Sequence, residues 1–68
     1  MFAYRLLRRR QVIVNLVDGS ALAGILFRQA GPLLILKNAT VLERGAQPAP
    51  AEGDLVVERD RVLFIQAT

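Results

Sequence analysis

The sequence predicts a mainly β domain, in which a short N-terminal helix precedes a five-stranded, strongly bent antiparallel barrel. Three observations support this fold class. Apolar side chains recur at every second position from residue 12 onward, an Asp18-Gly19 pair follows the first such stretch, and Gly24 interrupts the second. A period of two is typical of strands, Asp-Gly is a strong hairpin signal, and a glycine inside a strand permits a sharp bend.

The N-terminal helix is predicted over residues 1–10. Positions 2–9 contain no glycine, proline or β-branched residue, and the apolar residues at positions 2, 6 and 7 can share one side of a helix. The arginines of this segment then face solvent. Because so short a helix is not stable by itself, we expect it to lie across the open end of the barrel.

The barrel is predicted over residues 11–67, and each strand is bounded by a turn signal. Asp18-Gly19 and Ala30-Gly31-Pro32 separate the first three strands, and a loop over residues 45–53, with two prolines, precedes the fourth. Asp60 and Arg61 connect the last two strands, and this short connection requires a sharp corner. The predicted strands are residues 12–17, 21–29, 33–41, 54–59 and 62–67.

The second strand has apolar residues on both faces. Leu22, Gly24 and Leu26 share the face expected to cover the core, whereas Ile25 and Phe27 lie on the other face. An isolated chain would leave that second face exposed, so we expect a subunit or protein partner at Ile25 and Phe27, with a core role for Phe27 as the alternative. Phe64 alternates with Val62 and is expected in the core.

The composition indicates that the domain associates with other chains. Sixty-eight residues form a single domain, and 53% of them are apolar, although a chain this short encloses little interior. Cysteine and histidine are absent, so no disulfide can supplement the core and no metal or cofactor is expected. The longest apolar runs, residues 33–36 among them, are far below the roughly 20 residues that span a bilayer, and we expect a soluble cytoplasmic protein without a membrane partner.

Basic residues exceed acidic residues by nine to six, and eight of the nine are arginine. Four arginines lie within six positions: Arg5, Arg8, Arg9 and Arg10. Because planar guanidinium groups match phosphate oxygens, the cluster favours a polyanionic partner. The alternative is that these residues form a solvated helix face.

An enzyme is not expected. The single serine, Ser20, lies in a predicted turn, and no histidine or cysteine is present to activate a nucleophile. Gly19 and Gly24 have the spacing of the two glycines of a phosphate-binding loop, but the Lys-Ser/Thr that should follow is missing.

The order of several short motifs resembles that of the Sm/LSm family. These motifs are Asp18-Gly19, Gly24-x-Leu26, Gly53-x-Leu55-Val56-Val57-x-Arg59 and Val62-x-x-Ile65. Residues 16–38 are particularly similar to the bacterial Hfq branch of the family, which shares the glycine spacing and the Leu-Lys-Asn ending. The resemblance covers nearly the whole chain and implies an SH3-like, Sm-like barrel.

The resemblance also implies a closed ring of five to eight subunits, in which the fourth strand of one subunit pairs with the fifth strand of its neighbour. In this chain, residues 55–58 of one copy would pair with residues 62–66 of the next. The subunit number is not encoded in any residue count. The interface implied is Leu55, Val56, Val57, Glu58, Val62, Leu63, Phe64 and Ile65.

Members of the family usually bind single-stranded RNA, stacking bases in the loop between strands two and three and adding basic residues from the loop between strands four and five. Here residues 29–33 contain no aromatic residue or asparagine, and Arg59-Asp60-Arg61 lacks the family's glycine or histidine. Base stacking is worth about 1–3 kcal/mol per base, so its loss leaves mainly phosphate attraction. The candidate nucleic-acid residues are Arg5, Arg8, Arg9, Arg10, Arg59 and Arg61.

Two functions therefore remain open at this stage. The first is a ring that binds RNA or another polyanion through its arginines, without the base-stacking pocket of the family. The second is a structural or adaptor ring in a larger assembly, such as a phage or multiprotein particle, with no nucleic-acid role. In the second case, Arg59 would pair with Glu58 or Asp60 across the subunit seam.

Overall fold

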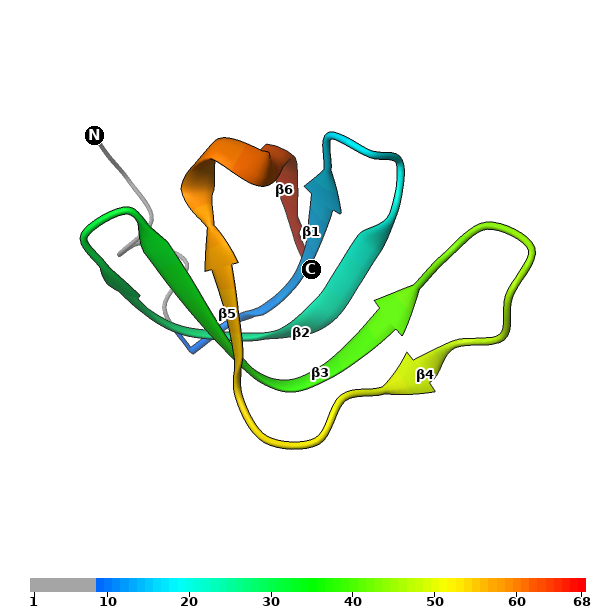
Figure 1. Ribbon diagram of the computed structural model, residues 1–68. Coiled ribbons are helices and arrows are strands. Elements are labelled where there is room, and N and C mark those ends of the chain that lie inside the picture. Colours follow the sequence, from blue (N-terminus) through cyan, green and yellow to red (C-terminus); the bar gives the residue numbers. More distant parts are fainter. Residues whose placement is uncertain (1–8) are drawn as a thin grey trace.

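The computed structural model describes residues 9–68, which form a strongly bent, open antiparallel barrel (Figure 1). The 3₁₀-helix η2 (Arg59–Arg61) connects the last two strands. The strands, in chain order, are β1 (Gln11–Leu16), β2 (Ala21–Ala30), β3 (Leu33–Leu42), β4 (Ala49–Pro50), β5 (Leu55–Glu58) and β6 (Val62–Ala67). The strands β1, β2, β3, β5 and β6 confirm the five predicted strands. No end differs from its predicted position by more than one residue.

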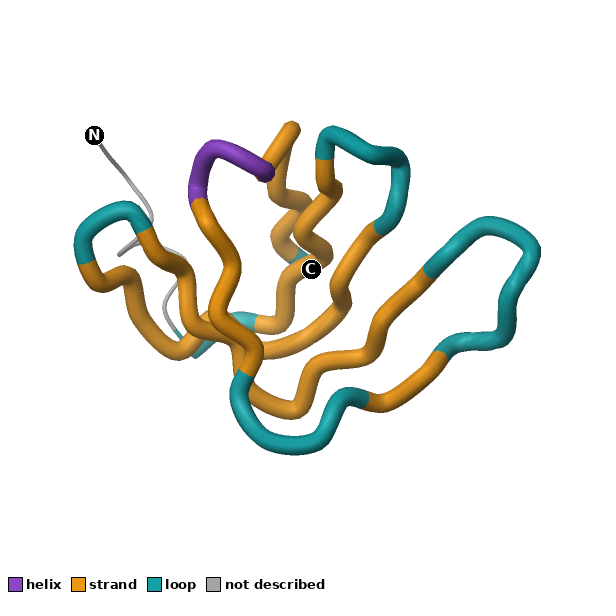
Figure 2. Tube along the Cα trace, viewed as in Figure 1, coloured by secondary structure: helices purple, strands orange, loops and turns teal. Residues whose placement is uncertain are grey.

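The strand order across the sheet is β4-β3-β2-β1-β6, and β5 also pairs with β3. Residues 33–36 of β3 pair with β5, and Thr40 and Val41 pair with β4. In Figure 1, β2 and β3 form the lower side of the barrel, with β5 on one side and β1 and β6 on the other. The short strand β4 was not predicted. It lies within the loop expected over residues 45–53 (Figure 2).

The bend of the β2–β3 hairpin comes from two bulges and one glycine. In β3, Asn38 and Ala39 lie opposite Gly24 alone, which forms one bulge, and Asn38 has φ of 53°. In β2, Phe27 is the extra residue of the other bulge. A Cβ at Gly24 would lie 3.0 Å from the Ala39 Cα and 3.1 Å from the Lys37 carbonyl oxygen. Only glycine permits this approach of the two strands, so the predicted role of Gly24 in bending β2 is supported.

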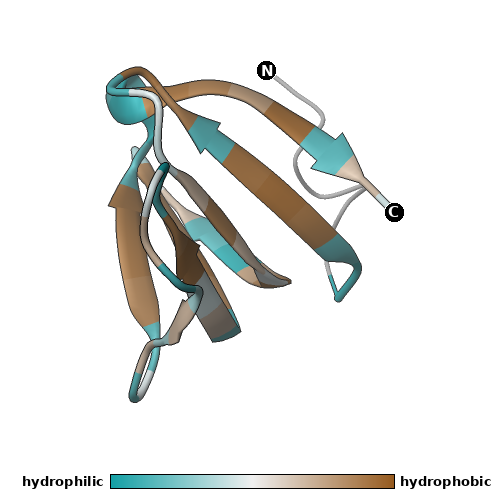
Figure 3. Cartoon of the chain, turned by 90° about the vertical axis from the view of Figure 1, so that its right-hand side faces the viewer, coloured by the Kyte–Doolittle hydropathy of each residue, from teal (hydrophilic) through white to brown (hydrophobic). Residues whose placement is uncertain are grey.

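Eight apolar residues form the core of the described part of the chain. They come from the inward-facing positions of the bent strands, where alternation places every second side chain. Figure 3 shows hydrophobic residues concentrated on the strands and hydrophilic residues mainly at connections and strand ends. The core residues are Val12, Val14, Leu22, Leu26, Leu34, Leu36, Ala39 and Val57.

The predicted N-terminal helix falls mostly on residues 1–8, which lie outside the described residues. Its last two residues are not helical. Arg9 has φ of 63°, in the left-handed region that a right-handed helix excludes, and Arg9 and Arg10 form a turn that leads into β1. None of the helical structure within residues 9–68 is long and apolar enough to cross a membrane.

The prediction that Phe64 lies in the core is wrong for the single chain. Its side chain is 52% exposed. Asn15 pairs with Phe64 and Leu16 pairs with Val62, so Leu63 is an extra residue in β6. Such a bulge reverses the alternation of side chains beyond it. Val62 and Ile65 therefore face the core, whereas Leu63 and Phe64 remain exposed.

Candidate nucleic-acid interface

Arg59 and Arg61 lie on η2, and the backbone fixes this helix to two hairpin turns. The Arg59 N–H donates to the Pro32 carbonyl oxygen at 2.8 Å, and the Val17 N–H donates to the Arg61 carbonyl oxygen at 2.9 Å. Pro32 belongs to the turn between β2 and β3. The structure thus places side by side the two loops for which the family resemblance implied RNA contacts.

The guanidinium groups of η2 are exposed and only weakly engaged within the chain. Arg61 Nε lies 4.0 Å from Glu58 Oε1, with both side chains about 70% exposed (69% and 71%). Exposed pairs of this kind contribute little to stability. Among residues 9–68 the ion pairs are this one and Lys37–Asp54, so Arg59 takes part in neither.

The β2–β3 turn offers few side-chain groups to a ligand. Gly31 has φ of 59°, and Pro32 fixes its own φ near −65°, a combination found in type II′ hairpin turns. The Gln29 side-chain amide donates to the Gly31 carbonyl oxygen at 3.0 Å, which ties this polar group to its own turn. The turn has no aromatic ring and no asparagine, so cationic groups dominate the chemistry of this region.

The second predicted arginine group is separate from η2. Arg5 and Arg8 lie outside the described residues. Arg10 Nη2 donates to the Thr68 carbonyl oxygen at 3.2 Å, beyond the end of β6, whereas η2 precedes its start. At about 3.3 Å per residue, the six residues of β6 separate these ends by roughly 20 Å. The predicted arginines that the structure describes therefore lie in two separate regions.

The structure adds two residues that sequence analysis did not select, Arg28 and Lys37, and places both near Phe27. The Arg9 guanidinium carbon lies 5.5 Å from the centroid of the Phe27 ring, and Lys37 Nζ lies 4.6 Å from it. Phe27 and Arg28 also line a surface hollow of about 410 Å³ together with Arg9 and Gln29. The sequence analysis predicted a subunit or partner contact for Phe27. Within the chain, its ring contacts the cationic groups of Arg9 and Lys37.

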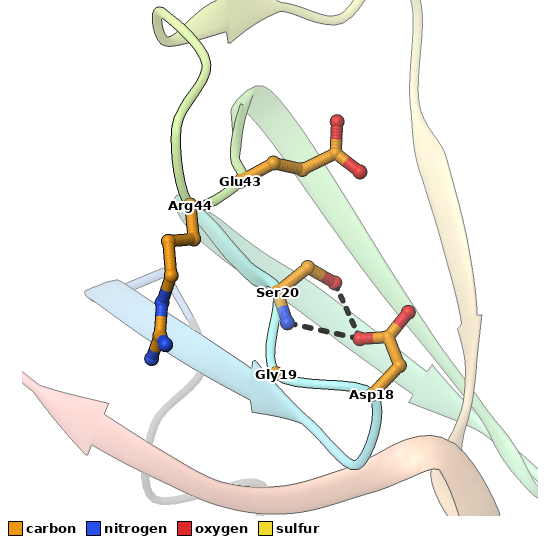
Figure 4. A pocket seen from close by; sticks show the side chains of 5 residues that line it. All are labelled: Asp18, Gly19, Ser20, Glu43 and Arg44. Atoms are coloured by element: carbon orange, nitrogen blue, oxygen red, sulfur yellow. Dashed lines mark hydrogen bonds between the residues drawn. The ribbon is translucent and has the colours of Figure 1, made fainter.

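A second polar hollow, of about 390 Å³, lies at the β1–β2 hairpin (Figure 4). The Ser20 N–H and hydroxyl both donate to Asp18 Oδ1, at 2.9 and 2.6 Å. These hydrogen bonds lower the pKa of the exposed Asp18 carboxyl below its ordinary value of 3.8. Arg44 extends away from this carboxylate in Figure 4. Asp18 is thus engaged in its own turn.

The hairpin itself differs in detail from the expected tight Asp-Gly turn. The Gly19 N–H donates to the Leu16 carbonyl oxygen, and Leu16 and Ser20 pair beyond it. Only Gly19, with φ of 96°, takes positive φ, as in a three-residue hairpin loop that ends in a glycine bulge. Within residues 9–68, no group of three potential metal-ligating side chains is present.

The eight predicted interface residues divide into two sets by their position in the strands. Val57 is buried in the core of its own barrel, and Leu55, Val62 and Ile65 pack against that core. The others point outward. Val56 is 58% exposed and Leu63 is 63% exposed, and Glu58 and Phe64 are exposed as well. The outward set is therefore the more accessible to another subunit, whereas Leu55, Val62 and Ile65 are only partly exposed.

Comparisons with known proteins agree on the fold. No protein-family model and no curated protein matches the chain. A heptameric archaeal Sm protein is 29% identical, with 94% of this chain and 93% of that protein covered and a TM-score of 0.81. The Pyrococcus abyssii Sm protein, solved in complex with a uridine heptamer, is 25% identical over 94% and 90% of the two chains, with a TM-score of 0.82.

The P. aerophilum SmAP1 heptamer is 28% identical, covers 100% of this chain and 97% of its own, and has a TM-score of 0.82. A chain of the NatC complex bound to CoA has a TM-score of 0.80 at 20% identity, with 100% and 87% covered, and shares the fold alone. The chain therefore has an Sm-like fold. The particular similarity of residues 16–38 to the Hfq branch stays a prediction.

Proposed function

We propose that this chain, whose fold is that of the Sm proteins, assembles into a closed homo-oligomeric ring and binds single-stranded RNA mainly through backbone phosphates. The observation that carries the proposal is a pair of open sheet edges with exposed apolar side chains. The likeness to archaeal Sm proteins over nearly the whole chain supports it, because two of these are heptamers and one was solved with a uridine heptamer.

The ring follows from the two open edges. Among the described strands, β5 pairs only with β3 and β6 pairs only with β1. Each thus keeps one unpaired row of backbone groups, and unpaired edges are templates for another strand. We infer that β5 of one copy pairs with β6 of the next. Because these edges differ, the contact is head-to-tail, which gives a ring when the rotation between neighbours closes.

Apolar surface at the same place supports the pairing. A groove of about 490 Å³ lies at the barrel opening, with mostly aliphatic walls contributed by β1, β2, β3 and β5. Val56, Leu63 and Phe64 are exposed on the two edge strands. A neighbouring subunit would cover these side chains, and the burial of apolar surface would stabilise the assembly by about 25 cal/mol per Å².

RNA binding is assigned to the cationic groups at η2. Arg59 and Arg61 are exposed beside the β2–β3 turn, and a ring repeats this pair once per subunit. Repetition raises avidity even where each contact is weak. Since the turn provides no stacking ring and no asparagine, we expect binding that depends strongly on salt and weakly on sequence.

We propose binding, with no catalytic step. The serine hydroxyl that could act as a nucleophile belongs to Ser20, and it donates to Asp18 in an exposed turn. No histidine or cysteine is available to activate it.

Native mass spectrometry, with and without a labelled U-rich or A-rich oligonucleotide, tests both parts of the proposal. We expect one discrete oligomer of five to eight copies and an additional mass of whole oligonucleotides. Fluorescence anisotropy at low and moderate salt then compares the double variant Arg59→Ala/Arg61→Ala with Arg44→Ala. Arg44 is the control because it removes the same charge and belongs neither to η2 nor to the turn between β2 and β3.

The result that supports the proposal is loss of oligonucleotide affinity in the η2 variant and unchanged affinity in the control. A well-folded monomer at micromolar concentration would contradict the ring. A ring that binds no oligonucleotide at low salt would contradict RNA binding and favour the structural or adaptor function.

A further inference from the structure

A projecting segment between β3 and β5 contains two of the three prolines of the chain. Residues 43–50 are all exposed, and the loop that leads from β3 to β4 extends away from the other strands (Figure 1). Within residues 9–68, no side chain of this segment takes part in a hydrogen bond or an ion pair. The side chains of the segment are thus free of polar contacts within the fold.

Residues 47–50, called here the proline ridge, are held in an extended conformation. Pro48 and Pro50 have φ fixed near −65° by their own rings. Gln47 and Ala49 each precede a proline, whose ring excludes them from the helical region. Ala49 and Pro50 form β4 and also pair with β3. The ridge is therefore ordered before any partner arrives, which reduces the entropy lost on binding.

The open edge of β4 has hydrogen-bond acceptors but no donors. Among the described strands, β4 pairs only with β3, so its other edge is free. The Ala51 N–H donates to the Ala39 carbonyl oxygen at 2.8 Å, which directs the backbone of Ala51 toward β3. Because backbone groups alternate in direction along an antiparallel strand, those of Pro50 point away from β3, and continued alternation turns those of Pro48 the same way. Both residues lack an N–H, so the edge offers carbonyl oxygens and apolar rings alone.

We propose that the proline ridge is a docking site for a protein groove lined by tryptophan and tyrosine side chains. The aromatic faces would pack against the exposed proline rings, and indole N–H or phenol O–H groups would donate to the outward carbonyl oxygens. Extended proline-rich segments bind aromatic-lined grooves in this way. The inference goes beyond the proposed function, because docking at the ridge requires no nucleic acid.

The same features argue against two other occupants. An added β-strand needs N–H donors on the edge that it joins, and the ridge has none there. A nucleic acid needs positive charge, whereas residues 45–51 contain no charged side chain. The nearest flanking charges are one arginine and two glutamates, namely Arg44, Glu43 and Glu52. An aromatic groove requires neither edge donors nor a cationic surface.

The ridge is separate from the surfaces assigned above. It contains none of the eight predicted interface residues and no part of η2, which follows β5. In the proposed ring, the ridge would occur once per subunit. A partner with several grooves would then gain avidity from the repetition.

Purified WW, SH3 and EVH1 domains are suitable probes, because each has an aromatic-lined groove that binds proline-rich segments. NMR of the isotope-labelled full-length protein locates the contact. We expect at least one domain to shift the amide signals of residues 46–52 and to leave those of η2 unchanged. Binding by none of the three domains, or shifts confined to another surface, would overturn the inference.

The double variant Pro48→Ala/Pro50→Ala tests the proline rings. We expect it to weaken binding of the domain about tenfold, the scale of truncating an interface hot spot. Pro32→Ala is the matched control, since it removes the third proline and should leave this affinity unchanged. Native mass spectrometry and circular dichroism verify that each variant keeps its oligomeric state and fold.

The sign of the effect identifies the mode of binding. The two alanines restore outward N–H groups, so a partner that adds a β-strand would bind the double variant more tightly than wild type. Tighter binding would therefore overturn the inference. A probe domain whose groove tryptophan is replaced by alanine should no longer bind, and unchanged binding by it would also contradict the assignment.

Oligonucleotide anisotropy separates this inference from the proposed function. The double variant should bind the oligonucleotide as wild type does, because the ridge has no cationic group. A folded, assembled double variant that loses oligonucleotide affinity would identify nucleic acid as the occupant and overturn the inference. If a domain binds the ridge but no oligonucleotide binds, the docking site stands and RNA binding is wrong. If the oligonucleotide binds and no domain does, the docking site is wrong and the proposed function stands.

Discussion

Single residues in the turns and bulges determine how this chain bends. Gly24 lies where β2 meets the bulge of β3, and the atoms that face it are the Ala39 Cα and the Lys37 carbonyl oxygen. Because these are backbone atoms, they cannot move aside as the end of a flexible side chain would. The spacing Gly24-x-Leu26 indicated this role in the sequence, but the identity of the opposing residues depends on the β3 bulge.

We predict that Gly24→Ala lowers the free energy of unfolding by about 1–3 kcal/mol, as expected for overpacking against backbone. Urea unfolding followed by circular dichroism measures the change. Gly45→Asn is the control, because nothing lies within 4 Å of a Cβ at Gly45 and asparagine tolerates its positive φ. Equal stability of Gly24→Ala and wild type would show that the hairpin can widen.

The lowered pKa of Asp18 gives a pH-dependent contribution to stability. Folding favours the ionised carboxylate. Its contribution to stability is therefore fully present above pH 3.8 and is lost as the pH falls through the lower pKa of the folded state. We predict that Asp18→Asn lowers Tm at pH 7 and that the difference from wild type shrinks below pH 3.8. Thermal unfolding at several pH values measures it. A difference that is constant from pH 7 to pH 2 would show that the charge has no role.

At the scale of the element, the edges of β5 and β6 connect the fold to its proposed assembly. The two strands keep their alternation until Leu63, where the β6 bulge turns both Leu63 and Phe64 outward. The extra residue enlarges the exposed apolar area on one of the two open edges. A single strand that alternated perfectly would have placed Phe64 in the core instead.

We predict that Val56→Lys prevents ring formation and leaves the barrel folded, because this side chain lies outside the core and on the β5 edge. Val17→Lys is a matched control. Its side chain is 55% exposed, against 58% for Val56, but it lies in a hairpin turn. Sedimentation velocity and circular dichroism report assembly and folding. An intact ring in Val56→Lys would contradict the β5–β6 pairing.

The strands were predictable from the sequence because periodicity and turn residues act locally. Asp18-Gly19 and Gly31-Pro32 specify where β2 begins and ends, and the apolar alternation specifies its inward face. The bulges were not predictable, since they depend on pairing between strands distant in sequence. For the same reason the cation–π site was missed. Phe27, Lys37 and Arg9 come together only after the β2 and β3 bulges form.

At the scale of the whole molecule, a small core and two open edges favour assembly. The core of residues 9–68 has eight apolar residues, and a single core in a domain this small rarely contributes more than about 3–5 kcal/mol. The excess of apolar residues in the composition indicated that the core alone is too small to bury them. The family resemblance indicated that association into a ring would cover the remainder. The subunit number could not be inferred, because it depends on the rotation between neighbouring subunits.

We predict that the thermal stability depends on protein concentration, as expected when folding is linked to assembly. A hundredfold dilution should lower the free energy of unfolding by about 2 kcal/mol per subunit, or Tm by about 10 °C for a domain of this size. Differential scanning fluorimetry over that range measures the shift. Val56→Lys should show no such dependence. A wild-type Tm that does not change on dilution would indicate a self-sufficient monomer.

The short strand β4 has a consequence for how growth of the assembly ends. It lies at one end of the sheet, it has two residues, and its second residue, Pro50, has no N–H to donate to an added strand. Prolines on such a border discourage lateral addition. In the proposed assembly, this border would therefore discourage copies from adding sideways, and growth would be confined to the β5 and β6 edges that close the ring.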